Sequence, residues 1–87
     1  MMYKNTINAI QADLEQEITE ALYQAEANAE KGNKELVDSV MNNAFDSVYM
    51  VMKILKTLGE GATGYELLNR WSNEWHPKFC GYLNKVK

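Results

Sequence analysis

The sequence has very few of the residues from which metal sites, disulfides and many catalytic sites are built. Its 87 residues include one cysteine, one histidine and one proline. The single cysteine, Cys80, excludes a disulfide within the chain and is typical of a reducing compartment. One cysteine and one histidine also fall short of the four ligands that a structural zinc site requires. We therefore expect no metal and no cofactor.

Signatures of catalysis are missing as well. His76 and Cys80 are four residues apart and would face the same way on one helix, but this spacing alone does not indicate a nucleophile with its base. The run from Gly59 to Gly64 matches the letters G-x-G-x-x-G, but it follows a predicted helix and not a strand. The sequence therefore favours a protein that is not an enzyme.

The chain also lacks strand and membrane signals. No segment shows sustained two-residue alternation of apolar and polar residues, so no strand is predicted. The N-terminal stretch MMYKNTINAI has no apolar core of signal-peptide length, and charged and amide residues interrupt the long apolar segments. We expect a cytoplasmic protein without a membrane segment. Its hydrophobic content of 46% is enough for a packed core in one domain over residues 1–87.

The most apolar long segment runs from Leu36 to Leu58 and predicts a central helix. On a helical wheel its apolar residues cover about half of the circumference, and only Ser47 interrupts them. One neighbouring helix would not cover so wide an apolar face. The pattern therefore indicates a helix that packs against two partners.

The preceding segment is predicted to supply the first of these partners. Apolar residues at three- to four-residue spacing indicate a helix from about residue 5 to residue 30. A short break follows, in which Gly32 suits a left-handed C-terminal cap and Asn33 suits an N-cap. Such a short connection makes the two helices antiparallel neighbours.

Residues 63–87 are predicted to form the second partner, a third arm. Thr63 and Glu66 have the spacing of a capping box. Pro77 is expected to end the helix near Trp75 or to kink it there. The predicted fold is all-α: an antiparallel helical hairpin plus a third arm broken at Pro77, giving a bundle of three to four helices.

Charge is distributed unevenly along the chain. The net charge is −3, but residues 1–46 hold nine acidic and three basic residues, whereas residues 47–87 hold three acidic and six basic residues. The first helix would therefore have an acidic outer face. Some aromatic and Met residues also lie outside the predicted core, and these types are enriched at protein interfaces.

These observations favour a small module that binds another protein. The predicted contact residues are Asp13, Glu17, Glu20, Tyr23, Tyr49 and Met50. The size and charge are similar to those of phage and mobile-element proteins that inhibit a host protein, so such an inhibitor is one form of the hypothesis. A homodimer is another form, because a narrow bundle with this apolar content has surplus apolar surface to bury.

One run of residues gives an alternative. The run Leu58-Gly-Glu-Gly-Ala-Thr-Gly64-Tyr65-Glu66-Leu67-Leu68 resembles the start of PadR-type winged-helix regulators, in which a helix and a short turn precede Gly-Tyr-Glu-Leu. The likeness covers about a quarter of the chain, and the long acidic first helix has no counterpart there. It implies a helix-turn-helix DNA-binding regulator using residues 63–87. Its base-contacting residues would be Arg70, Asn73, Lys78, Asn84 and Lys85.

Overall fold

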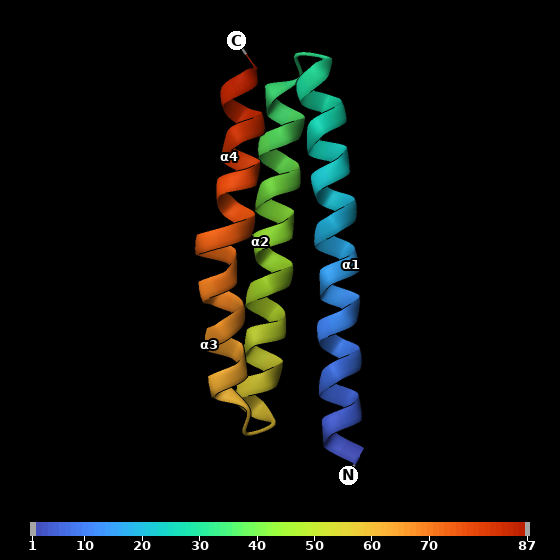
Figure 1. The fold of residues 1–87 in the computed structure, drawn as a ribbon, viewed down its shortest axis with the longest axis vertical. Helices are drawn as coiled ribbons and strands as arrows, with labels where there is room; N and C mark the ends of the chain where they lie inside the picture. Colours follow the sequence, from blue (N-terminus) through green and yellow to red (C-terminus); the bar gives the residue numbers. More distant parts are fainter. Residues whose placement is uncertain (1, 87) are drawn as a thin grey trace.

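All the regular secondary structure of the described residues is helical. This computed structural model describes residues 2–86, with side chains from Asn5 onward. The elements are α1 (Met2–Glu30), α2 (Lys34–Thr57), α3 (Gly61–Arg70), a π-helical turn η1 (Trp71–Trp75) and α4 (His76–Lys85). Because no loop separates α3, η1 and α4, these three pieces form one arm beside α2 (Figure 1). The predicted all-α fold, a helical hairpin plus a third arm in pieces, is confirmed.

The three arms lie side by side in an elongated bundle of 48 × 17 × 16 Å. In Figure 1, α2 lies between α1 and the third arm. The helix α1 also contacts α4, so the three arms enclose a common core. The turn between α2 and α3 lies at the same end of the bundle as the start of α1, and the turn between α1 and α2 lies at the other end (Figure 1).

Both turns between antiparallel helices close in the same way. Gly32 has φ +74° and Gly59 has φ +83°, the left-handed region that glycine enters without strain. In each turn the residue after the glycine bonds to a carbonyl of the last helical turn: Asn33 N to Asn28 O at 2.9 Å and Glu60 N to Leu55 O at 2.7 Å. This pattern is a Schellman motif. The predicted N-cap at Asn33 is confirmed, since its side chain accepts a 3.2 Å hydrogen bond from Leu36 N–H.

The predicted capping box at Thr63 and Glu66 is wrong. The helix α3 begins at Gly61, with Glu60 as its N-cap residue and no side-chain cap hydrogen bond. The Schellman turn at Gly59 is the reason: its closing residue, Glu60, also starts the next helix, so Thr63 already lies inside the first turn.

The third arm changes from η1 to α4 between Trp75 and His76, close to the predicted break, and continues beyond Pro77. The chain widens into η1 just before the proline, where His76 N–H bonds to Trp71 C=O, and Pro77 lies in the first turn of α4. Because proline has no N–H, it cannot complete the helical ladder, and the wide turn accommodates this gap. The wide turn also helps to keep residues spaced by four on one face of the arm. In an α-helix of 3.6 residues per turn, each four-residue step rotates the side chain by about 40° away from that face. A turn with more residues reduces this rotation. The buried residues with this spacing are Leu67, Trp71, Trp75 and Phe79.

The core is apolar and receives side chains from every arm. Its largest fully buried side chains are Phe79, Leu14, Ile18, Leu55, Val37 and Val48. Between residues 5 and 86, no polar or charged residue is buried, and no buried side-chain N or O atom lacks a hydrogen-bond partner. Packing of apolar faces therefore holds the arms together, and polar contacts occur at the edges.

Within residues 2–86, no helix carries an apolar stretch long enough to cross a lipid bilayer.

Candidate functional site

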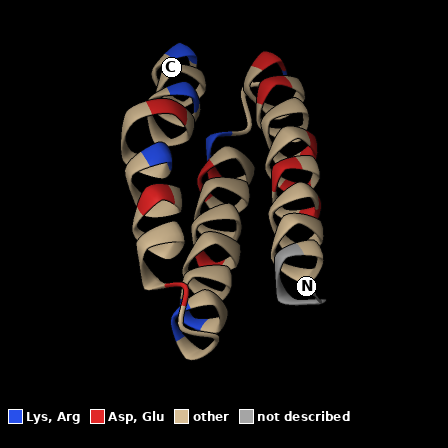
Figure 2. Ribbon diagram, turned by 60° about the horizontal axis from the view of Figure 1, so that its bottom comes forward, with Lys and Arg blue, Asp and Glu red and all other residues tan. Residues whose placement is uncertain are grey.

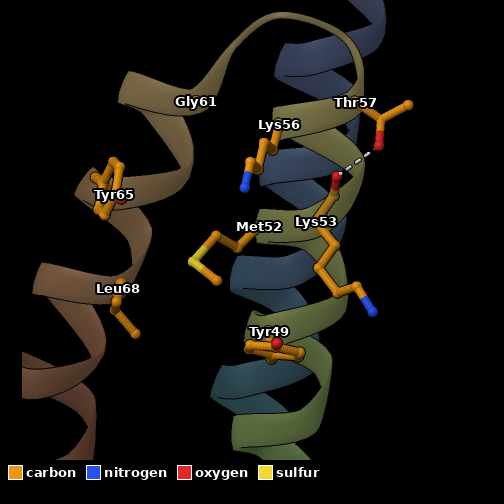
Figure 3. A pocket seen from close by; sticks show the side chains of 8 residues that line it. All are labelled: Tyr49, Met52, Lys53, Lys56, Thr57, Gly61, Tyr65 and Leu68. Carbon is orange, nitrogen blue, oxygen red and sulfur yellow. Dashed lines mark hydrogen bonds between the residues drawn. The ribbon is translucent and has the colours of Figure 1, made fainter.

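A groove separates the C-terminal half of α2 from the first turns of α3 (Figure 3). Its volume is about 400 Å³. We call it the α2–α3 groove, and define it by its lining residues: Tyr49, Met52, Lys53, Lys56 and Thr57 from α2, and Gly61, Tyr65 and Leu68 from α3.

Glycines of α3 explain why the groove exists. Gly64 is buried against α2, where an added Cβ would lie 3.1 Å from Met52 Cγ and 3.3 Å from Met52 O. The two backbones therefore approach closely at this point. Gly61 lines the groove, and no atom lies within 4 Å of the position of a Cβ there. The first turn of α3 thus contributes backbone to the groove without filling it.

Aromatic side chains form the walls of the groove. Tyr65 is 69% exposed and Tyr49 is 46% exposed, and they come from opposite sides of the groove (Figure 3). Beyond Tyr49 the aromatic rings continue toward the core: the Tyr49 and Phe45 ring centroids lie 6.4 Å apart, and those of Phe45 and Trp71 lie 5.4 Å apart. The wall formed by Tyr49 is therefore supported by the core, whereas Tyr65 projects from the surface of α3.

The charged groups that line the groove are both cationic. Lys53 Nζ lies 5.5 Å from the centroid of the Tyr49 ring, and Lys56 extends into the space between α2 and α3 (Figure 3). No Asp or Glu lines the groove. In the described part of the chain neither lysine makes an ion pair, because the ion pairs there belong to Arg70. The arrangement combines half-buried Met52 and Leu68 with aromatic walls and unpaired positive charge.

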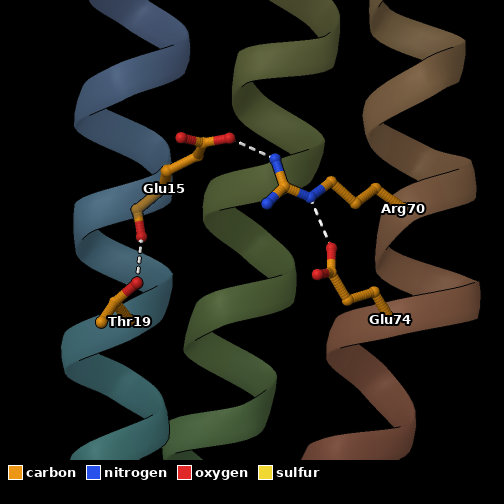
Figure 4. A network of polar contacts seen from close by, with 4 residues as sticks. All are labelled: Glu15, Thr19, Arg70 and Glu74. Carbon is orange, nitrogen blue, oxygen red and sulfur yellow. Dashed lines mark hydrogen bonds and ion pairs between the residues drawn. The ribbon is translucent and has the colours of Figure 1, made fainter.

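The seam between α1 and the third arm is closed by polar contacts (Figure 4). The Arg70 guanidinium binds the carboxylates of Glu15 and Glu74, the latter at 2.5 Å from Nε. It also lies 4.5 Å from the centroid of the Trp75 ring. The hydrogen bond from Arg70 lowers the pKa of the Glu74 carboxyl, and the hydrogen bonds to both carboxylates raise the pKa of Arg70. The positive charge on this seam is neutralised within the molecule.

A second contact closes the same seam near α4. The Tyr82 hydroxyl donates a 3.0 Å hydrogen bond to Glu26 Oε2. Burial raises the pKa of Tyr82, and the hydrogen bond to Glu26 raises it further. The hydroxyl therefore stays protonated and keeps donating through the neutral range.

Acidic residues recur along α1 (Figure 2), and Glu17 and Glu20 line a hollow between α1 and α2. Ser47 Oγ donates a 2.8 Å hydrogen bond to Glu17 Oε1, which explains the one polar residue within the apolar arc of α2. The hollow is shallow, with a volume of about 210 Å³, lies beside this contact and is lined by Glu17, Glu20, Ala21, Gln24, Val40, Asn43 and Ala44. The two edges of α2 therefore differ in charge.

The residues predicted to bind a partner do not form one surface. Glu17 and Glu20 line the acidic hollow, and Tyr49 lines the α2–α3 groove. Asp13 is exposed on α1, Tyr23 is 70% exposed on the same helix, and Met50 is 63% exposed on α2 outside both hollows. Their function stays a prediction. Lys53, Lys56 and Tyr65 were not among the predicted contacts, although the spacing of Tyr49, Lys53 and Lys56 along one helix edge is a signal in the sequence.

The residues predicted to contact DNA are spread along the third arm. Arg70 is held by its two carboxylates and Trp75, while the others are exposed: Asn73, Lys78, Asn84 and Lys85. A helix-turn-helix places two helices at a wide angle across a short turn. Here α3, η1 and α4 run in one direction (Figure 1). DNA binding stays an untested prediction that this geometry does not favour.

His76 and Cys80 do meet on α4, with 3.4 Å between Cys80 Sγ and His76 Nε2. Trp71 lies against the same histidine, with 5.8 Å between the ring centroids. In the region that the structure describes, no group of three or more His, Cys, Asp or Glu residues is placed to hold a metal ion.

Comparison of the chain with protein-family models, with curated proteins and with solved structures finds no match.

Proposed function

We propose that this chain is a small, non-enzymatic module that binds another protein through the α2–α3 groove. The observation that carries the proposal is the gathering of exposed aromatic side chains at the groove, with Tyr65 at 69% and Tyr49 at 46% exposure. Scattered exposed apolar residues are ordinary on a protein surface, but a cluster around a hollow is typical of a binding site. Tyrosine and methionine are among the residue types enriched at interfaces.

The shape of the groove supports the same proposal. It lies between two antiparallel helices and has Met52 and Leu68 between its aromatic walls. Such a surface suits recognition of a helix, in which apolar side chains of the partner enter a groove between helices. Methionine adapts its shape to different neighbours, so Met52 allows the groove to adjust to an inserted side chain. Inhibition of a host protein and self-association are two uses of such a module, and they differ in what occupies the groove.

The test is affinity capture from the source cells with the full chain as bait, read by quantitative mass spectrometry. The groove variant is Tyr49→Ser with Tyr65→Ser. The matched control is Tyr23→Ser, because Tyr23 is 70% exposed on α1 and lies outside the groove. We expect the groove variant to lose its captured protein by about tenfold or more, and the control to keep it.

Circular dichroism checks that all the variants fold. Loss of the captured protein in Tyr23→Ser but not in the groove variant would move the binding surface to α1 and overturn the role of the groove. A bait that captures no specific protein and is monomeric by light scattering would overturn the proposal as a whole.

A further inference from the structure

We infer that the partner segment for the α2–α3 groove is acidic: carboxylates on the partner pair with Lys53 and Lys56, while an apolar side chain of the same segment enters between Tyr49 and Tyr65. This inference rests on the proposed function and names the chemistry of the partner. It is carried by charge complementarity between the groove and its occupant.

The charge of the groove is opposite in sign to the net charge of the chain. The chain has a net charge of −3, yet two lysines and no carboxylate line the groove. Arg70 is neutralised from within the fold by Glu15 and Glu74, whereas the described lysines, inside and outside the groove, make no ion pair. Lys53 and Lys56 have no such carboxylate in the described part of the chain. A partner that brings carboxylates would supply what the fold itself does not.

The two lysines project from α2 in different directions (Figure 3). Lys56 extends toward α3 across the space beside Tyr65, and Lys53 follows the edge of α2 toward Tyr49 (Figure 3). A side chain inserted over Met52 and Leu68 would therefore lie beside Lys56. A partner that continues past Tyr49 would reach Lys53 on the side of α2 away from α3. From Gly61 to Leu68 the α3 wall spans about two helical turns. The occupant thus needs a segment of similar length, with an apolar residue between acidic ones.

Other occupants fit these observations less well. A second copy could offer the acidic residues of its own α1, but such a contact joins two different surfaces and leaves a free groove on the next copy. Assemblies of that kind grow as open chains unless their rotation closes a ring. A nucleic acid strand would need a longer track of cations than the two lysines that line this groove.

The first part of the test selects peptides from a displayed random library on the immobilised full chain. The strongest peptide is synthesised together with a matched version in which every Asp and Glu is replaced by Asn and Gln. Their affinities are measured by fluorescence anisotropy at low and at high ionic strength. We expect the selected peptides to be rich in Asp and Glu around an apolar residue. The amide version should bind at least about tenfold more weakly, and salt should weaken the acidic peptide.

The second part changes the protein. Lys53→Glu with Lys56→Glu should weaken the acidic peptide by at least about tenfold. The control, Lys31→Glu with Lys34→Glu, makes the same change in net charge at the opposite end of the bundle and should stay within about twofold of the unchanged protein. Tyr49→Ser with Tyr65→Ser should also abolish binding, because the apolar side chain would lose its walls.

The outcomes separate the two proposals. The proposal of an acidic partner is wrong, and the groove remains the binding site, if three results occur together. The amide peptide binds the unchanged protein as tightly as the acidic peptide does, the Lys53→Glu, Lys56→Glu variant keeps its affinity for the acidic peptide, and the Tyr49→Ser, Tyr65→Ser variant loses it. If the tyrosine variant binds normally, the groove and the proposed function both fail. If the protein forms a concentration-dependent oligomer that is lost in the Lys53→Glu, Lys56→Glu variant, the occupant is a second copy and the inference is overturned. If an oligonucleotide displaces the peptide from the groove, the occupant is a nucleic acid and the inference is likewise overturned. A selection without any binder would overturn it outright.

Discussion

Three places in this bundle set a cation beside an aromatic ring, and two of them differ clearly in what surrounds the pair. On the seam between α1 and the third arm, Arg70 lies 4.5 Å from the Trp75 ring centroid and binds two carboxylates, and Trp75 is only 4% exposed. In the α2–α3 groove, Lys53 lies 5.5 Å from the Tyr49 ring centroid, and Tyr49 is 46% exposed. The same two kinds of group close a structure when the cation is paired within the fold, and stay exposed when it is not.

Side-chain size along the third arm explains why one part of the arm packs closely in the core and the other leaves a groove beside α2. The first turn of α3 contains Gly61 and Gly64, which bring no side chains to the interface with α2. From Leu67 onward the arm turns large residues inward, including Trp71 and Trp75. The arm therefore fills its interface at one end and leaves a hollow at the other. The following predictions address this contrast, in order of expected effect.

The largest effect is expected from the closed seam. Trp75→Ala should lower the free energy of unfolding by about 3–5 kcal/mol, because it leaves a cavity in the core and removes the ring beneath Arg70. Tyr65→Ala in the groove should change it by no more than about 0.5 kcal/mol. Urea unfolding followed by circular dichroism measures both. Equal losses in the two variants would mean that the groove is part of the folding core.

Two glycines give the next contrast. Gly64→Leu should destabilise the fold by about 1–3 kcal/mol, because the new side chain meets Met52 and forces α2 and α3 apart. The control is Gly81→Leu on α4, where a Cβ would meet nothing within 4 Å. That change should stabilise the fold by about 0.5–1 kcal/mol through helix propensity. Thermal unfolding distinguishes the two by sign, and a stabilised Gly64→Leu would show that the helices do not approach closely there.

Replacing the two cations themselves sharpens the comparison. Arg70→Met should cost about 1 kcal/mol, because its ion pairs are partly exposed and screened but two carboxylates and a ring lose their partner. Lys53→Met should cost less than about 0.5 kcal/mol, since no carboxylate depends on it. Urea titrations at low and high salt measure both. The Arg70→Met loss should shrink at high salt, and a larger loss in Lys53→Met would contradict the distinction drawn between the two sites.

The smallest effect concerns pH. The hydrogen bond from Arg70 lowers the pKa of Glu74 below its ordinary value of 4.5. A carboxyl with a lowered pKa stabilises the folded state above its unfolded pKa, and this contribution is lost as pH falls through the folded value. The melting temperature of Glu74→Gln should therefore lie slightly below that of the unchanged protein at pH 7 and meet it in acid. Glu66→Gln, which removes a carboxylate that does not contact Arg70, is the control and should show no such convergence. A gap that persists in acid would contradict the role of the ion pair.

The fold could be predicted from the sequence because its signals are local. The apolar arc of Leu36–Leu58 corresponds to α2 at Lys34–Thr57, and Asn33 caps that helix as expected. The start of α3 was mispredicted because a turn closed by Gly59 and Glu60 took precedence over the capping pattern at Thr63.

The groove could not be predicted in the same way, because it depends on register between two helices. Wheel geometry places Tyr49 at the edge of the apolar arc of α2, but it does not say which residue of α3 stands opposite. The close approach at Gly64 sets that register and brings Tyr65 across from Tyr49. Arg70 and Glu15 likewise meet across 55 positions of sequence, and no local pattern marks the pair.

The elongated shape of the bundle determines where a partner bound in the groove would lie relative to the two ends of the molecule. The long axis measures 48 Å, and the start of α1 and the end of α4 lie at opposite tips of the rod (Figure 1). The α2–α3 groove lies in the half of the rod that contains the start of α1. A tether at the end of α4 would leave this half facing outward, whereas a tether at the start of α1 would crowd it. The two tips of the rod are therefore not equivalent with respect to the groove.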